Sequence, residues 1–110
     1  MEKSAEQFVQ LHIDMDVDPS REKEMVDNFH GAFKPTMSRQ PGYVDVRLMR
    51  LRSAVVGPAP DGPNYRMLIS FRTEEERLTW VATDDHQRVW PLIESCIKGQ
   101  NWGAVLYDPT

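Results

Sequence analysis

Residues 71–91 read FRTEEERLTWVATDDHQRVWP, and this stretch decides the second half of the fold. Thr73 and Glu76 have the spacing of a capping box, in which the threonine caps a helix and the glutamate reaches back. A second helix start is predicted at Asp84 or Asp85, whose short acidic side chains suit a cap position. The stretch therefore predicts the end of a strand followed by two helical segments.

The two helical segments carry an unusual amount of large, partly polar side-chain surface. Trp80 lies near the end of the first segment, and His86 and Trp90 lie in the second. Helical spacing predicts that Leu78 and Val81 also face inward. Such surface lines either a core or a pocket, and the sequence alone leaves both open.

Upstream, residues 8–15 alternate as a strand does. The odd positions make a wholly apolar face, and the even positions make a mixed face that includes His12. Asp18 and Pro19 then suit the start of a helix. Its apolar stripe recurs every fourth residue, at Met25, Phe29, Phe33 and Met37. Pro35 is expected to kink or shorten this helix.

A hairpin follows. Strands are predicted over residues 43–52 and 65–71, with a Gly/Pro-rich loop over 53–64 between them. A change of apolar parity at Met49 indicates a bulge in the first of these strands.

The C-terminal part is predicted to finish a helix and add a strand. The second helical segment, interrupted early by Pro91, is expected to include Ile97 and to stop at Gly99. The last strand is predicted over residues 102–107.

The element order is β-α-β-β-α-β, which predicts an α+β, ferredoxin-like domain with a four-stranded antiparallel sheet and both helices on one face. We take residues 1–110 as one such domain, with residues 1–6 expected to be loose. Because the strands have apolar character on both sides, we expect a homodimer that packs through the open sheet face.

The composition narrows the function classes. The net charge is -4 and the basic residues form no stripe, so no nucleic-acid partner is expected. No apolar run is long enough for a membrane span, and the N-terminus has no signal-peptide pattern. A single cysteine, Cys96, suits a reducing compartment, and we predict a cytoplasmic protein. The three histidines lack ligand spacing, so no metal site is expected.

In element order and in three motifs the chain resembles the antibiotic biosynthesis monooxygenase family of dimeric α+β barrels. The motifs are QPGY at residues 40–43, SFRTEEERLTW at 70–80 and DHQ at 85–87. The resemblance spans residues 8–107. It implies a dimeric barrel with a cleft between each sheet and its helices. It also implies a monooxygenase, without cofactor, that oxidises a planar phenolic or polyketide-like molecule.

The family also contains haem-degrading enzymes, and their pattern is not met here. That branch resembles this chain at Trp80, but its strand-one asparagine falls near His12. Its iron-binding histidine falls on Trp90, which cannot ligate iron. The resemblance therefore does not extend to haem degradation.

Several residues are candidates for a site. His12 or His86 could accept a phenolic proton, since histidine titrates near neutrality. Trp80 and Trp90 could stack on a flat substrate, although both could equally fill a core. Arg47 and Arg66 could hold an anionic oxygen, and Tyr43 could donate a hydrogen bond. An ion pair of Arg47 with Asp45 is the competing interpretation for that arginine.

Two other functions stay open. The barrel could bind a small hydrophobic metabolite without catalysis, or it could be an accessory domain with a filled interior. An enclosed space beside Trp80, lined by a base, would favour the enzyme.

Overall fold

The computed structural model describes residues 8–110, so the expectation for residues 1–6 lies outside the described chain. Strand β1 is Val9–Val17, and a helical stretch follows it. That stretch comprises η1 (Pro19–Arg21), α1 (Glu22–Asn28), η2 (Phe29–Phe33) and α2 (Lys34–Met37). The hairpin strands are β2 (Tyr43–Arg50) and β3 (Tyr65–Phe71). The chain continues with α3 (Glu74–Val81), α4 (Asp84–Glu94) and β4 (Ile97–Tyr107).

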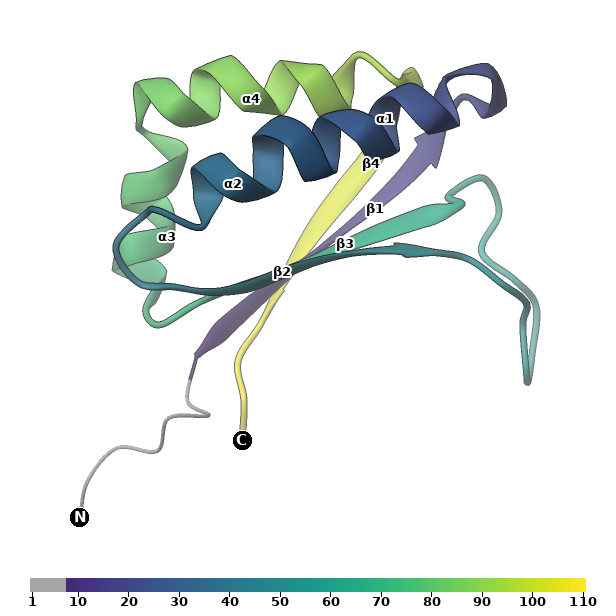
Figure 1. The fold of residues 1–110 in the computed structure, drawn as a ribbon. Helices are drawn as coiled ribbons and strands as arrows, with labels where there is room; N and C mark the ends of the chain where they lie inside the picture. The colour runs from purple at the N-terminus through teal and green to yellow at the C-terminus, as the bar shows by residue number, and fades with distance from the viewer. Residues whose placement is uncertain (1–7) are drawn as a thin grey trace.

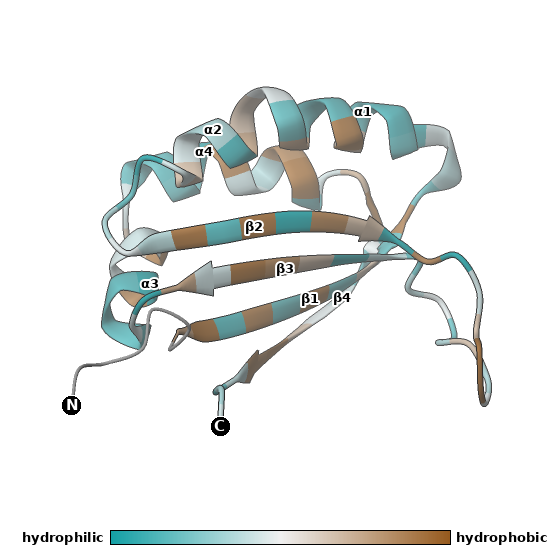
Figure 2. Cartoon of the chain, turned by 60° about the horizontal axis from the view of Figure 1, so that its bottom comes forward, coloured by the Kyte–Doolittle hydropathy of each residue, from teal (hydrophilic) through white to brown (hydrophobic). Residues whose placement is uncertain are grey.

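The four strands form one antiparallel sheet in the order β2-β3-β1-β4, the ferredoxin-like α+β arrangement predicted from the sequence. The helices cover one face of this sheet and leave the other face open (Figure 1). Hydropathy alternates along the strands, as a sheet with one covered face requires (Figure 2). None of the helices in residues 8–110 has the length and apolar character that a bilayer crossing requires.

The core lies between the sheet and the helices. On β1 the odd positions face it: Ile13, Met15 and Val17 are buried. The helical stripe predicted from the sequence supplies the opposite side, and its four members are fully or almost fully buried: Met25, Phe29, Phe33 and Met37.

Helices α1 and α2 form one continuous run that widens in the middle. Residues Phe29–Phe33 form a π-helical turn, and the Lys34 N–H donates to the Phe29 carbonyl. The wide turn ends just before Pro35, whose ring would clash with a carbonyl of an ordinary helix. The predicted kink at Pro35 is therefore replaced by a wide turn ahead of it, and the helix continues to Met37.

Several predicted details were wrong, among them the end of the strand predicted over residues 43–52, which stops at Arg50. The bulge lies between Tyr43 and Asp45 and not at Met49, which pairs regularly with Arg66. Helix α4 passes through Pro91 without interruption and ends at Glu94. Ile97 therefore begins β4, where its buried side chain meets the same core that a longer helix would have reached.

The open sheet face is mixed in character. Apolar side chains with substantial exposure on or beside it are Val44, Met49, Val105 and Tyr107. On β1 this face is polar instead, because Gln10, His12 and Asp14 occupy the even positions. The β2–β3 loop projects on the same side of the sheet as this face (Figure 1).

Candidate functional site

A hollow of about 430 Å³ lies between the sheet and helices α3 and α4. The sheet supplies its apolar floor, and the helices supply aromatic and polar groups. The lining residues from the helices are Phe33, Arg77, Trp80, Val81, His86 and Trp90. Those from the strands are Leu11, Ile13, Ile69, Trp102, Ala104 and Leu106.

The Thr73 hydroxyl begins α3 and so sets the position of Trp80. It accepts a hydrogen bond of 3.1 Å from the Glu76 N–H, and it donates one of 3.1 Å to the Glu76 carboxylate. The Thr73 cap predicted from the sequence is confirmed, but the Glu76 carboxylate reaches back to the Thr73 hydroxyl and not to its backbone N–H. Trp80 is 3% exposed, while Leu78, predicted to face inward, is 52% exposed.

The hydroxyl of Thr83 joins the two helices. It donates to the Trp80 carbonyl at 2.7 Å and accepts from the His86 N–H at 3.1 Å. Thr83 is therefore the cap of α4, and the prediction of Asp84 or Asp85 was wrong. Both acids lie in the first turn, where they complement the positive end of the helix dipole.

His86 lies between two indole rings. Its ring centroid is 5.1 Å from that of Trp80 with the planes at 80°, and 6.5 Å from that of Trp90 with the planes at 18°. Phe33 completes the aromatic wall, with its centroid 6.1 Å from Trp80 and 6.3 Å from Trp90. The imidazole is thus held in an apolar setting at the edge of the hollow.

Burial lowers the pKa of His86 below its ordinary value, because the apolar surroundings disfavour the imidazolium ion. No carboxylate within residues 8–110 forms an ion pair with it to offset this effect. At neutral pH His86 is therefore an uncharged imidazole that can accept a proton or a hydrogen bond.

Two lining residues with side-chain N–H groups, Arg77 and Trp102, were not identified from the sequence. Arg77 lies in the interior of α3, and its side chain is 15% exposed. Its Nε and Nη2 donate to the two oxygens of Glu74 at 2.7 and 2.6 Å. This pairing raises the pKa of Arg77 and lowers that of Glu74. From the sequence, an i,i+3 pair of this kind indicates only a solvated helix surface.

Trp102 is the second missed residue. Its ring meets that of Trp90 with centroids 5.1 Å apart, and its indole N–H donates to Glu94 at 3.3 Å. The alternation of Trp102, Ala104 and Leu106 along β4 was the available signal, because these positions share one face.

His12 does not line this hollow. It occupies the open face of β1, where its Nε2 lies 2.8 Å from Gln10 Oε1 and its ring 4.6 Å from that of Tyr107. The sheet separates it from Trp80. His12 could serve the cleft only if its face of β1 looked toward the helices, and in the structure that face looks away from them.

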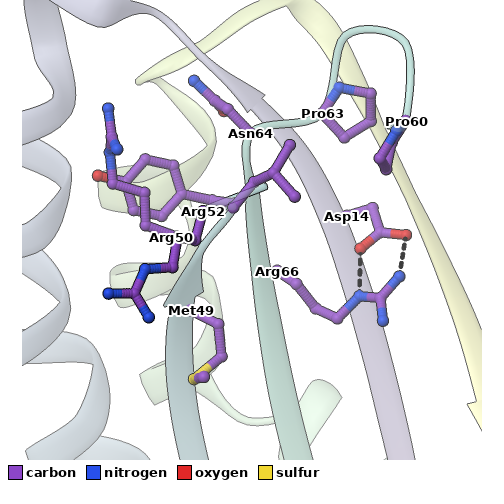
Figure 3. A pocket seen from close by; sticks show the side chains of 10 residues that line it. Asp14, Met49, Arg50, Arg52, Pro60, Pro63, Asn64 and Arg66 are labelled. Carbon is purple, nitrogen blue, oxygen red and sulfur yellow. Dashed lines mark hydrogen bonds and ion pairs between the residues drawn. The ribbon is translucent and has the colours of Figure 1, made fainter. Parts of the chain in front are cut away.

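Arg47 and Arg66 also lie on the open face, and each is paired. Arg47 donates to Asp45 at 2.8 Å, the competing interpretation made from the sequence. Arg66 donates to both oxygens of Asp14, at 2.6 and 3.2 Å. The Asp14–Arg66 pair borders a second hollow, of about 360 Å³, under the β2–β3 loop (Figure 3).

Tyr43 lies at the start of β2, outside the hollow beside Trp80. Its ring meets Phe71 edge-on, with centroids 6.4 Å apart. Burial raises the pKa of its hydroxyl, so it stays protonated at neutral pH. Of the seven candidate site residues, the structure brings three together: Trp80, His86 and Trp90.

No acidic or sulfur-containing side chain is among the described residues that line the hollow. Among residues 8–110, no three side chains of the types that bind metal ions are grouped closely enough to hold one. The hollow itself offers aromatic, aliphatic, imidazole and guanidinium groups.

Comparison with solved structures supports the fold. A candidate antibiotic biosynthesis monooxygenase from Bordetella bronchiseptica superposes with a TM-score of 0.75 at 18% identity, covering 96% of this chain and 99% of that one. SnoaB from Streptomyces nogalater, a cofactor-independent oxygenase crystallised as a point mutant, superposes with a TM-score of 0.71 at 14% identity. The match covers 96% of this chain and 94% of SnoaB.

A dimeric ferredoxin-like protein of unknown function from Jannaschia superposes with a TM-score of 0.77 at 10% identity, covering 93% of this chain and 99% of that one. No family model matches the sequence, and no curated protein matches it. The superpositions on solved structures show that the chain has the fold of the antibiotic biosynthesis monooxygenases, as its element order and sequence motifs indicated. At these identities the likeness carries the fold and no further property.

Proposed function

We propose that the protein is a cofactor-independent monooxygenase that acts on a planar phenolic or polyketide-like molecule in the hollow beside Trp80. The observation that carries the proposal is the position of His86. This uncharged imidazole lies between two indoles at the edge of an apolar hollow large enough for a small aromatic molecule. The fold shared with SnoaB supports the reaction class.

In this proposal the substrate supplies the electrons. His86 accepts the proton of the acidic phenol or of the tautomeric carbon acid, and leaves an electron-rich anion. The anion passes one electron to dioxygen, and the resulting substrate radical and superoxide combine into a peroxide. The imidazolium of His86 returns its proton to the peroxide, and loss of water then leaves a quinone carbonyl. One oxygen atom enters the product and the other leaves as water, so no external reductant is needed.

The aromatic wall orients the substrate. Trp80 is buried and fixed by the Thr83 hydrogen bond to its carbonyl, and Trp90 faces the hollow beside it. A flat ring held against these indoles keeps its acidic position near His86, and such positioning is a large part of enzymatic rate enhancement. Arg47, Arg66 and His12 lie across the sheet and have no part in this scheme.

The test is oxygen uptake with anthrone as substrate. We expect turnover by the wild type and a drop of about 10²-fold or more in His86→Gln, the range for a positioned base. The matched control is His12→Gln, on the opposite face, which is expected to retain wild-type turnover. A His86→Gln protein that is folded and fully active would remove His86 from the mechanism.

Binding without catalysis is the second candidate. It is favoured by the apolar character of the lining, in which His86 and Arg77 are the charged or readily titrated groups. Micromolar binding of anthrone without oxygen uptake above the uncatalysed rate would select this function.

We also propose that a second copy covers the open sheet face. Exposed Val105 and Tyr107 on β4, and Val44 and Met49 on β2, give that face an apolar component beside its ion pairs. Two such faces packed together would form the barrel that the resemblance implies. A cytoplasmic location likewise remains a proposal, supported by the unpaired Cys96.

A further inference from the structure

We infer that the hollow beside Trp80 selects aromatic ligands that carry an anionic group, and that Arg77, held by Glu74, is the residue that determines this specificity. The inference rests on the proposed function only in using the same hollow. It concerns which ligands bind there, whether or not they react.

Arg77 has side-chain N–H donors that Glu74 does not engage. A guanidinium has five N–H donors, and Glu74 engages Nε and Nη2. Within residues 8–110, no partner is found for Nη1. That part of the chain also has no buried side-chain nitrogen or oxygen that lacks a partner. Nη1 therefore keeps some exposure to solvent, and Arg77 is among the residues that line the hollow.

The charge in the lining of the hollow is positive. Aromatic walls of this kind can bind a quaternary ammonium ion as readily as a flat anion. No acidic residue is among those that line the hollow, whereas Arg77 is. Glu74, which balances the charge of Arg77, is 39% exposed and lies outside the lining. A ligand in the hollow therefore meets the cation of this pair, which favours a carboxylate or phenolate.

Glu74 is a positioning residue in this arrangement. Its two hydrogen bonds fix the plane of the guanidinium, so a ligand carboxylate meets donors that are already oriented. The low exposure of Arg77 limits competition from water, which strengthens a charge-assisted hydrogen bond relative to one at the surface.

The test compares 9-anthracenecarboxylate with its neutral amide, with binding followed by isothermal titration. We expect the wild type to bind the carboxylate at least tenfold more tightly, the ratio that one charge-assisted hydrogen bond supports. In Arg77→Gln the preference should fall to about one, with affinity for the amide unchanged. Arg66→Gln, which removes an arginine of the open face, should keep the wild-type preference.

Equal wild-type affinity for the two ligands, or failure of both to bind, would overturn the inference without any variant. A preference that persists in Arg77→Gln would also overturn it. If Arg77→Gln does not fold, Arg77→Lys serves instead and should reduce the preference, because an ammonium lacks the planar fork. Selective binding of the carboxylate without oxygen uptake from oxidisable ligands would refute the proposed reaction and leave this inference standing.

Discussion

The backbone N–H of His86 donates a 3.1 Å hydrogen bond to the hydroxyl of Thr83, and this bond fixes the first turn of α4. We predict that Thr83→Ala lowers the free energy of unfolding by about 1 kcal/mol, the usual effect of losing a cap. Asp84→Ala, at the residue expected from the sequence to be a cap, should have a smaller effect. Chemical denaturation of both variants measures the difference, and equal losses would contradict the assignment of Thr83.

The lowered pKa of His86 predicts a pH dependence of stability. The folded protein binds the proton of His86 less readily than the unfolded chain, whose histidine titrates near 6.5. The corresponding stability is complete above that value and is lost as the pH falls through the folded-state pKa. His86→Phe should therefore flatten the decline in unfolding free energy between pH 7 and pH 5.

The measurement for His86 is denaturant unfolding at several pH values, with a direct NMR titration of the imidazole. His30→Gln, an exposed histidine on the first helical run, serves as the control and should retain the wild-type slope. Identical slopes in His86→Phe and the wild type would show that this imidazole is not desolvated.

Replacing Trp80 and replacing Trp102 should have different effects on the unfolding free energy and on ligand binding. Trp80 is 3% exposed and part of the core, so Trp80→Ala is expected to lower the unfolding free energy by about 3–5 kcal/mol. Trp102 is 37% exposed at the hollow, so Trp102→Ala should destabilise much less and yet weaken binding of an anthracene ligand. Isothermal titration calorimetry measures the ligand affinity, and denaturant unfolding measures the stability. A Trp102→Ala variant with wild-type affinity would exclude Trp102 from the site.

The turn before β2 depends on Gly42. Its φ is +82°, and an added Cβ would lie 2.7 Å from the Cβ of Glu76. Gly42→Ala should therefore destabilise by more than the roughly 1 kcal/mol expected from backbone strain alone. Gly57→Ala, with φ +78° and no neighbour within 4 Å, isolates that strain. The difference between the two losses in unfolding free energy should be smaller when Glu76 is also replaced by alanine. Equal losses at the two glycines in the wild-type background would show that the protein relieves the close approach.

The proposed dimer predicts an effect of charge on the open face. Val105 is 55% exposed there, so Val105→Arg should place an unpaired charge in the interface and shift a dimer to monomers. Leu78→Arg, at an exposed position of α3, should leave the assembly unchanged. Sedimentation at micromolar concentrations measures both, and a monomeric wild type would refute the dimer.

The strands of the sheet were predictable because side-chain alternation identifies strands and separates their two faces. Ile13 and Met15 lie on the wholly apolar face of β1, and that face alone could supply a core. The same rule would have assigned His12 to the opposite face, but the sequence left the orientation of β1 undecided. Phe8 lies among the even positions, and this mixed character left open which face the helices cover.

The residues that line the hollow were harder to predict than the sheet, because their burial depends on contacts between residues distant in sequence. Arg77 resembles any surface arginine paired three residues back along a helix, and its burial follows from the neighbouring sheet. Ile97 satisfied the helical spacing of α4 equally well, so the pattern gave no reason to begin β4 there. Asp84 or Asp85 was predicted in place of Thr83 because threonine and aspartate both suit a cap position.

The hollow has one wall on an edge strand. Trp102, Ala104 and Leu106 belong to β4, whose strand partner in the sheet of residues 8–110 is β1. Trp102 also ties this border to α4, through its hydrogen bond to Glu94 and its contact with the ring of Trp90. We therefore expect entry and exit of molecules to depend on transient loosening of these Trp102 contacts, while the buried ring of Trp80 stays fixed.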